Sequence, residues 1–362
     1  MNKKLKIIIP VFISLAVFYL ITASKSLSQE IQFLPVWTID LESYIKDDSN
    51  PLSQEDFSNI VPFKMGQNLG WFNTDGKILN YITFPYKASI SENSYSLYGT
   101  SSDEIIINDA SNNEIAKITE KGFPYFAENR KFIFLPGGNS FAKLNDDGSA
   151  AWKYEGFTPI TAFSSSATGT AAGFANGSVI VFDSEGNISQ QYNPGGSNYE
   201  VILGIAVSDS SKYIATLSGQ DSQRFVISKK TDESYGSHTS IIFFKTMENE
   251  VNRQVLIKFS RDEKKVFYNS ASGIGIVNCR TFKNTEIPLK GRILSIQETE
   301  SGNEIIVLSK NENIYTISTI ESFDVLTGSF SFDADNAFIA TKGNSLFVGR
   351  DGRISKIDII HK

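Results

Sequence analysis

One recurring pattern limits the possible folds of this chain more than any other feature: two short apolar runs that flank a polar turn with an acidic residue and a glycine. Each copy is typical of a β-hairpin, because the turn needs a residue with positive φ and glycine supplies it. The clear copies are LGWFNTDGKILNYITF (69–84), FAKLNDDGSAAWKYEG (141–156), SVIVFDSEGNISQQY (178–192) and NSLFVGRDGRISKIDI (344–359). Their expected turn residues are Asp75 and Gly76, Asp147 and Gly148, Glu185 and Gly186, and Asp351 and Gly352.

Weaker hairpins fill the gaps, so that the turns recur about every 39 residues, close to the spacing of four-stranded propeller blades. A second series of polar turns precedes most of them, as in ILGIAVSDSSKYIATLSG (202–219) and VLIKFSRDEKKVFYNS (255–270). Two turns in fixed phase define a four-stranded unit, which a layered sandwich would not predict. We therefore predict an all-β chain: a single β-propeller of four-stranded blades, eight favoured and seven possible, after an N-terminal hydrophobic helix.

The two ends of the predicted ring are less regular than its middle. The first blade shows only three strands, and Pro35–Leu41 is the candidate for the missing one, with Glu42–Asn59 as an insertion. The last blade is expected over 329–360, with SFSFDADNAFIAT (329–341) as its first two strands. Rings of this kind close by sharing strands between the chain ends, because closure removes exposed sheet edges.

The N-terminus predicts where the protein is located. Lys3, Lys4 and Lys6 precede an apolar run over residues 7–23, a pattern typical of a signal-anchor or a signal peptide. We expect residues 1–28 to be that segment, 29–59 to be an N-terminal segment with a possible ring-closing strand, and 60–362 to be the propeller. The expected location is the cytoplasmic membrane, single-pass, with the propeller on the periplasmic side. Cleavage near Ser28, giving a secreted or periplasmic protein, and a buried helix are the alternatives.

Composition excludes several classes of function. The net charge is −6, and because the first 28 residues hold four lysines and no acid, the remainder carries about −10. An acidic body argues against nucleic acid as a partner. With His238 and His361 as its only histidines, the chain cannot form a multi-histidine metal site, and a histidine-based triad is disfavoured. Its one cysteine, Cys279, cannot form an intrachain disulfide.

No residue stands out as catalytic, cofactor-binding or metal-binding. Asp146 and Asp147 lie side by side, but repetition of the turn favours a hairpin over acid–base chemistry. Asp333 and Asp335 lack further oxygen ligands for calcium. A lone cysteine without a nearby histidine favours a buried, inert thiol. Trp152 is expected to pack between blades, with a stacking platform as the alternative, and Trp37 and Trp71 to pack where the ring closes.

The hairpins carry a resemblance to known propellers. AKLNDDGSAAWKY (142–154) resembles the quinoprotein-like (PQQ-repeat) motif of strand, acidic turn with glycine, and strand with tryptophan, whereas VSDSSKYIATLSG (207–219) looks more like a WD40 unit. In other copies the tryptophan position is Tyr81, Gln190 or Ile357. The resemblance covers about residues 60–360 and implies a fold rather than an activity.

Exported propellers of this appearance include quinoprotein dehydrogenases and the propeller subunit of the outer-membrane β-barrel assembly machinery. The dehydrogenases hold their quinone with a vicinal disulfide, which a single cysteine cannot form. The assembly subunit is normally anchored by a lipid, but no lipidation cysteine lies directly after the apolar run of this chain.

These features favour a membrane-anchored, extracytoplasmic, non-enzymatic scaffold or accessory subunit of an envelope complex, with protein partners in the cell envelope, the membrane contacted through residues 7–23, and no cofactor. Lys229–Ser240, expected as an enlarged hairpin loop, and Lys245–Gln254, an enlarged loop between blades, are the best candidates for partner contact. Within them we single out Tyr235, His238, Glu248 and Asn249. The alternatives are a small-molecule-binding or quinoprotein-like enzyme that uses the central channel, and an extracytoplasmic sensor.

Overall fold

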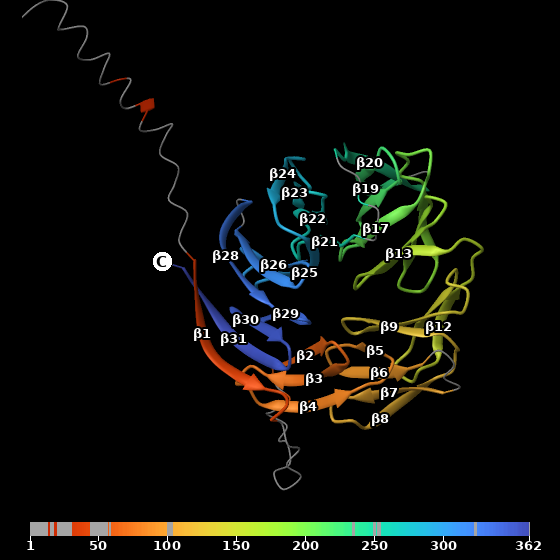
Figure 1. The fold of residues 1–362 in the computed structure, drawn as a ribbon. Coiled ribbons are helices and arrows are strands. Elements are labelled where there is room, and N and C mark those ends of the chain that lie inside the picture. Colours follow the sequence, from red (N-terminus) through yellow and green to blue (C-terminus); the bar gives the residue numbers. More distant parts are fainter. Residues whose placement is uncertain are drawn as a thin grey trace, which may run out of the picture.

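Eight antiparallel sheets form a ring in the computed structural model of the chain (Figure 1). The structure describes residues 14, 18–19, 31–43, 57, 59–99, 104–233, 236–248, 251, 255–321 and 324–361. Within this part of the chain seven sheets have four strands and one has three. The predicted eight-bladed β-propeller is thus confirmed, and we number the blades 1 to 8 along the chain.

The strands follow one another blade by blade. Blades 1 and 2 comprise β2 (Ile60–Met65), β3 (Asn68–Asn73) and β4 (Ile78–Thr83), then β5 (Lys87–Ile90), β6 (Ser94–Tyr98), β7 (Ile105–Asp109) and β8 (Glu114–Ile118). Blades 3 and 4 comprise β9 (Phe123–Ala127), β10 (Arg130–Phe134), β11 (Phe141–Leu144) and β12 (Ala150–Tyr154), then β13 (Ile160–Ser165), β14 (Gly169–Phe174), β15 (Val179–Asp183) and β16 (Ile188–Tyr192).

The second half of the ring continues in the same way. Blades 5 and 6 comprise β17 (Ile202–Val207), β18 (Tyr213–Ser218), β19 (Arg224–Glu233) and β20 (Gly236–Thr246), then β21 (Ile257–Phe259), β22 (Lys265–Asn269), β23 (Gly273–Asn278) and β24 (Asn284–Pro288). Blades 7 and 8 comprise β25 (Arg292–Glu298), β26 (Glu304–Asn311), β27 (Ile314–Glu321) and β28 (Val325–Asp333), then β29 (Ala337–Lys342), β30 (Ser345–Arg350), β31 (Arg353–His361) and β1 (Ile31–Asp40).

The two ends of the described chain close the ring within one sheet. β1 pairs antiparallel with β31, from Ile31 opposite His361 to Asp40 opposite Arg353. The Leu41 N–H extends this contact with a 2.7 Å hydrogen bond to the Gly352 carbonyl. The expectation that Pro35–Leu41 completes the first blade is therefore wrong. Residues 35–40 lie in β1, the outermost strand of blade 8. Without β1, the edge of β31 would stay unpaired, and β1 covers it.

The expected start of the last blade is also wrong. Residues 329–333 belong to β28 in blade 7, and Ala334–Asn336 link that blade to β29. The turn at Asp351 and Gly352 consequently joins the second and third strands of its blade, not the third and fourth. Turns within a blade and links between blades have the same polar composition here, so the hairpin pattern alone could not distinguish them.

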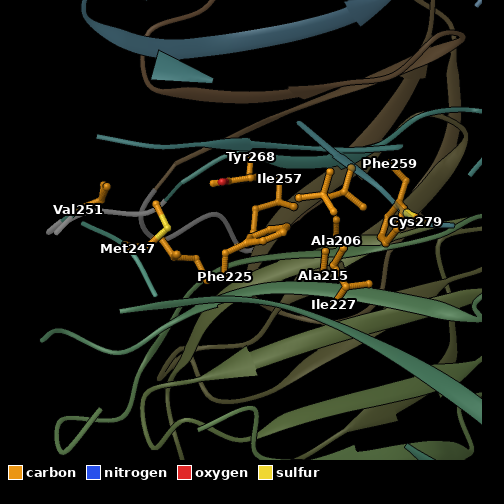
Figure 2. Close-up of a cluster of buried hydrophobic side chains, with 13 residues drawn as sticks. Ala206, Ala215, Phe225, Ile227, Met247, Val251, Ile257, Phe259, Tyr268 and Cys279 are labelled. Atoms are coloured by element: carbon orange, nitrogen blue, oxygen red, sulfur yellow. The ribbon is translucent and has the colours of Figure 1, made fainter. Parts of the chain in front are cut away.

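Apolar side chains fill the junctions between neighbouring blades. Between blades 5 and 6 the Phe225 and Tyr268 rings stack at 4.0 Å within a cluster that also holds buried Cys279 (Figure 2). Trp152 lies between blades 3 and 4, as expected, stacked on Phe182 at 5.4 Å. Trp37 packs at the ring closure, 6.2 Å from Phe72 of blade 1 and 5.9 Å from Phe347 of blade 8.

Trp71 does not lie at the closure. Its ring packs 5.7 Å from Tyr95, between blades 1 and 2, and its Nε1–H donates to the Glu92 carbonyl at 2.7 Å. The expected position is wrong because successive side chains of a strand face opposite sides of the sheet: Phe72 of β3 packs at the closure, so Trp71 faces blade 2.

Polar contacts tie the first turns of several blades together on one face of the ring, where a first turn is the one joining a blade's first two strands. Thr168 of blade 4 donates to the Asp209 carbonyl of blade 5 at 2.5 Å, and Ser210 donates to Glu263 of blade 6 at 2.7 Å. The Arg261 N–H then bonds Glu298 of blade 7 at 2.9 Å. This chain of contacts holds the blades in a fixed relation to one another on that face.

Among the residues that the structure describes, no helix is long and apolar enough to cross a membrane. The predicted anchor over residues 7–23 lies outside the described residues apart from positions 14, 18 and 19.

Candidate functional site

A two-stranded ribbon projects from blade 5, over residues 230–233 and 236–240. The inner neighbour of β19 is β18, whose first residue, Tyr213, pairs with Lys229. β19 and β20 then continue together as far as the pair of Glu233 and Gly236. The Lys230 N–H bonds the Lys212 carbonyl at 2.9 Å, so the base of the ribbon lies beside the first turn of blade 5.

The prediction of a loop over Lys229–Ser240 is therefore wrong. The segment SKKTDESYGSHTS has no apolar alternation, the usual signal of a strand that covers a core. It is a strand pair nevertheless, because backbone hydrogen bonds between β19 and β20 need no apolar face. The clusters of buried apolar side chains include none of the described residues of this ribbon.

The ribbon is held against blade 4 by a side-chain contact. Thr239 on β20 donates from Oγ1 to Gln190 Oε1 at 2.9 Å, and Gln190 is itself buried on β16. Isolated two-stranded hairpins are only marginally stable in water, so a contact with the body of the protein helps to hold the ribbon. Because this contact joins the ribbon to blade 4, it also restricts the direction in which the ribbon points.

A cleft of about 570 Å³ lies at the base of the ribbon, between blades 4 and 5. It is lined by three lysines, Lys212, Lys229 and Lys230, and by hydroxyl side chains that include Thr168, Ser189 and Thr231. Lys212 is exposed, and the other two lysines are half-buried. No ion pair within the described part of the chain involves Lys212 or Lys229.

One carboxylate, Asp183, also lines the cleft, and it is engaged in its own turn. Its Oδ1 accepts hydrogen bonds from the backbone N–H groups of Glu185 and Asn187, each at 2.9 Å. Burial pushes the pKa of Asp183 upward, but hydrogen bonds from Asn187, Glu185 and Gly186 outweigh it and lower that pKa below its ordinary value. Among the described side chains that line it, the cleft thus presents three cations and one anion, on an otherwise acidic protein.

Behind the cleft, the junction of blades 4 and 5 buries polar side chains. The hydroxyls of Tyr192, Thr216 and Ser228 are buried without a hydrogen bond of ordinary geometry to any described residue, although the Ser228 hydroxyl lies close enough to Tyr192 to oppose part of the effect of burial on the pKa of the phenol. Burial raises the pKa of Tyr192 above its ordinary value, so the phenol stays neutral. Buried polar atoms without partners lower stability, so this junction is less well satisfied than an apolar one.

Two of the residues expected to contact a partner lie near opposite ends of the strand β20. His238 is exposed on the ribbon opposite Thr231, whereas Glu248 is exposed beyond the far end of β20. With a rise of about 3.4 Å per residue, the 11-residue strand β20 separates the two ends by about 34 Å. Tyr235 and Asn249 lie outside the described residues.

The glycines of the four clear hairpin turns have the positive φ angles that such turns require. Gly76, Gly148, Gly186 and Gly352 have φ of 93°, 83°, 89° and 86°. At Gly186 the contact is also close, since an added Cβ would lie 2.5 Å from Trp152 Cγ.

The acidic turn residues make different contacts. Asp147 accepts from the Ser149 N–H at 2.9 Å, Asp351 accepts from the Asn336 N–H at 2.9 Å, and the Asp75 N–H donates to Asn73 at 3.1 Å. In the Gly186 turn, Glu185 contributes its backbone N–H, and the acceptor is the Asp183 carboxylate. Its position two residues before Glu185 is the signal that sequence reasoning missed.

Charged groups from several blades also converge near the ring axis. Lys258, on the innermost strand of blade 6, donates to the Ile296 carbonyl at 3.0 Å. Burial lowers its pKa, opposed by the negative charges of Glu298, Glu128 and Asp209, which come from blades 7, 3 and 5. Convergent carboxylates are what the channel alternative predicts.

Other residues with reactive groups fit structural roles. Burial, with smaller contributions from Glu263 and Asp262, raises the pKa of Cys279 to about 12, so the thiol is a poor nucleophile at neutral pH. Asp146 pairs with Lys131 at 3.0 Å rather than with Asp147. The described residues contain no group of three or more His, Cys, Asp and Glu side chains that could hold a metal ion.

The ring of eight sheets defines the class of protein as a β-propeller. The family model described as "beta-propeller protein" matches residues 1–362, and the chain belongs to this family. It is 26% identical over 345 residues to an uncharacterized protein of Treponema pallidum (strain Nichols), a match that covers 94% of this chain and 90% of that protein.

Solved structures show the same fold at low sequence identity. BamB from Moraxella catarrhalis matches with a TM-score of 0.56 and 14% identity, over 91% of this chain and 99% of that one. The computationally designed Ika8 protein matches with a TM-score of 0.60 and 12% identity, over 84% and 94%. A chain in the crystal structure of the Mitotic Checkpoint Complex matches with a TM-score of 0.54 and 12% identity, over 94% and 95%.

Proposed function

We propose that this propeller is a non-enzymatic interaction scaffold or accessory subunit of a cell-envelope complex, and that it contacts its protein partner through the ribbon of blade 5. The observation that carries the proposal is the ribbon itself. It adds backbone pairing beyond the body of the blade, covers no core, and is held in one direction by Thr239 and Gln190. A preorganised polar projection suits recognition, because ordering it on binding costs little entropy.

The fold supports a role in assembly without specifying one. Propellers present broad faces built from loops on a rigid ring, and such faces commonly carry binding functions. One of the similar chains belongs to the Mitotic Checkpoint Complex. Membership of a complex is a property of that protein, and it supports a protein partner for this chain as a proposal.

The envelope location rests on the N-terminal sequence. Three lysines ahead of the apolar run over residues 7–23 favour a cytoplasmic N-terminus and an extracytoplasmic body. Adding protease to intact spheroplasts tests this directly. Digestion of the propeller from outside, together with its recovery in the membrane fraction, is expected, whereas full protection until lysis would contradict the proposed location.

The proposed contact surface is tested by shortening the ribbon. Lys230 and Thr239 are cross-strand partners, so an Asn-Gly pair can replace residues 231–238 as a two-residue type I′ turn. The full-length variant and the parent are crosslinked in their native membrane, purified and compared by mass spectrometry. We expect envelope proteins to co-purify with the parent and to be lost from the variant, while the thermal unfolding midpoint is unchanged.

The matched control replaces exposed Lys290, in the link between blades 6 and 7, with Ala. Its partners are expected to match those of the parent. Recovery of the same partners with the shortened ribbon would contradict the proposed contact surface.

A small-molecule site in the central channel is the second candidate, favoured by the convergence of Glu128, Asp209 and Glu298 around Lys258. Thermal-shift screening of sugars, quinones and divalent cations on the full-length protein tests it. A stabilising compound whose effect is lost in Lys258→Met would support the channel. Effects that persist in that variant would place the compound elsewhere.

A further inference from the structure

We infer that the outer edge of blade 8, at the start of β1, contacts the lipid surface of the membrane that holds the N-terminal segment. This inference rests on the proposed envelope location, and it adds which part of the ring faces the bilayer and which side chains touch it. Two observations carry it: a group of exposed apolar side chains, and the short length of chain between the apolar run and β1.

Apolar side chains are exposed on the outermost strand pair of blade 8. Gln32 of β1 pairs with Ile360 of β31. Leu34 lies two residues further along β1 on the same face of the sheet, so it is a diagonal neighbour of Ile360. Leu34 is 52% exposed, Ile360 41%, and Val36, at the register shift of β1, 48%. Apolar residues scattered singly are ordinary on a protein surface, whereas a group of them marks a contact surface.

Blade 1 covers the second half of β1 but not the first. Phe33 packs on Phe330 of blade 7 at 4.9 Å, so Leu34, the next residue, faces the opposite side, toward blade 1. Blade 1 reaches β1 at Trp37, since an added Cβ on Gly76 would lie 3.2 Å from the indole ring. Leu34 precedes this contact and belongs to none of the apolar clusters that the described residues form. The beginning of β1 therefore presents an apolar face that described residues leave uncovered.

The length of chain before β1 brings this edge close to the proposed anchor. The apolar run ends at residue 23, and β1 begins at Ile31. Because an extended chain spans about 3.3–3.6 Å per residue, the connection over residues 24–30 reaches at most roughly 30 Å. Ile31 lies opposite His361, so both ends of the described chain meet at this edge (Figure 1). An apolar run embedded in the membrane thus holds the start of β1 within reach of the lipid surface.

The edge of β1 is unsuited to the addition of another strand. Pro35 has no N–H to donate, and the register shift between Pro35 and Trp37 leaves Val36 out of the pairing with β31. Proline and bulges are common means by which proteins prevent strand addition at an exposed edge. The backbone of β1 thus disfavours a partner strand, or a second copy paired edge to edge. A lipid surface needs only the exposed apolar side chains.

The tether makes a small apolar contact sufficient. A few aliphatic side chains bind a membrane interface weakly by themselves, because binding strength scales with the apolar area that is buried. A short linker converts this second contact into an intramolecular one with a high effective concentration. The body of the protein is acidic, so attraction to anionic lipid contributes nothing, and the contact should form on an uncharged membrane.

The test places a fluorescent probe at the contact. Leu34→Cys in the full-length protein is labelled with the fluorophore NBD, which reacts at the exposed position because Cys279 is buried. The protein is reconstituted into phosphatidylcholine vesicles, with or without a lipid that carries a nitroxide quencher on its acyl chain. We expect the nitroxide lipid to reduce the emission at least twofold.

The matched control carries the same probe at Ile188→Cys. Ile188 is 54% exposed, close to the value for Leu34, and it lies on blade 4, across the eight-bladed ring from blade 8. The nitroxide lipid is expected to leave its emission nearly unchanged.

A second variant removes the apolar contact without moving the probe. Val36→Glu with Ile360→Glu, in the protein labelled at position 34, is expected to reduce the quenching at least twofold while the thermal unfolding midpoint stays the same. Ile115→Glu with Ile241→Glu adds the same charge at similarly exposed residues of blades 2 and 5 and should leave the quenching unchanged.

The remaining outcomes separate this inference from the proposed location. A protein that does not float with the vesicles would contradict the location itself. A protein that floats but shows equally weak quenching at positions 34 and 188 would overturn the lipid contact and leave the location standing. If that protein also crosslinks from position 34 to another protein in the native membrane, the apolar edge belongs to a protein interface instead.

Discussion

Blade 4 meets its two neighbours in different ways. Its junction with blade 3 consists of aromatic rings: Phe141 alone contacts Phe132, Trp152, Phe163 and Phe182 within ring-centroid distances of 6.3 Å. Its junction with blade 5 combines an aliphatic cluster with the buried hydroxyls of Tyr192, Thr216 and Ser228. A cleft and a projecting ribbon lie at the edge of the second junction.

This difference distinguishes the junction with blade 3, which chiefly stabilises the fold, from the junction with blade 5, which carries the candidate site for recognition. Apolar burial at about 25 cal/mol per Å² makes the aromatic junction a large source of folding free energy. At the junction of blades 4 and 5, buried hydroxyls without partners reduce the stabilisation that apolar burial provides. The junction of blades 4 and 5 therefore carries features that folding alone does not explain. The substitutions below test this contrast, in order of the expected change in unfolding free energy.

The largest loss is expected from Phe141→Ala. The ring is fully buried and contacts both blades, so its removal leaves a cavity and should cost about 3–5 kcal/mol. Denaturant unfolding of the full-length protein measures the loss. Phe157→Ala, which removes a fully exposed ring near the same junction, is the control and should change little. A loss below about 1 kcal/mol at Phe141 would mean that the junction adjusts to fill the space.

A smaller loss is expected from Gly186→Ala, of about 1–3 kcal/mol, because the new Cβ meets Trp152 and the φ of +89° disfavours alanine. Gly195→Ala carries the backbone cost alone, since Gly195 has φ +70° but no atom within 4 Å of the added Cβ. The difference between the two variants therefore measures the contribution of the contact with Trp152. Equal losses in the two variants would show that backbone conformation, and not contact with Trp152, is responsible.

Tyr192→Phe should change stability by no more than about 1 kcal/mol, and in the stabilising direction, because the hydroxyl it removes is buried without a partner. Tyr268→Phe provides the opposite case. That hydroxyl bonds Asn284 and Glu286, each at 3.1 Å, and its loss should destabilise by about 1–2 kcal/mol. Destabilisation by both substitutions would reveal a partner for Tyr192, such as a bound water.

The smallest effect on folding is expected from Lys212→Glu. The side chain is exposed, and the contacts of this residue with Lys230 and Ser210 involve its backbone. The unfolding free energy should change by less than about 0.5 kcal/mol, so any loss of co-purified partners reports on recognition. A large loss of stability would place Lys212 in the structural framework of blade 5 instead.

Much of the ring could be predicted from hairpins. The turns at Gly76, Gly148 and Gly186 need glycine for local reasons, so their positions and spacing predicted strands and blades without knowledge of distant contacts. Trp152 between blades was predicted on the same basis. The candidate site was predicted only in part: Lys229–Ser240 was singled out, but as a loop, and Lys212 was not recognised because it lies in an ordinary first turn that only folding places beside Lys229 and Lys230.

The sequence by itself determined the repeating hairpin, the four-stranded blade with eight copies favoured over seven, and the acidic charge of the body, because turn chemistry and apolar alternation act between residues near one another in the chain. Only the tertiary structure decided that β1 closes blade 8, that Trp71 lies between blades 1 and 2, and that the lysines of blade 5 meet blade 4 in a cleft. These depend on which sheet edges remain open and which blades become neighbours. Such relations join residues as distant as Ile31 and His361, and no local pattern encodes them.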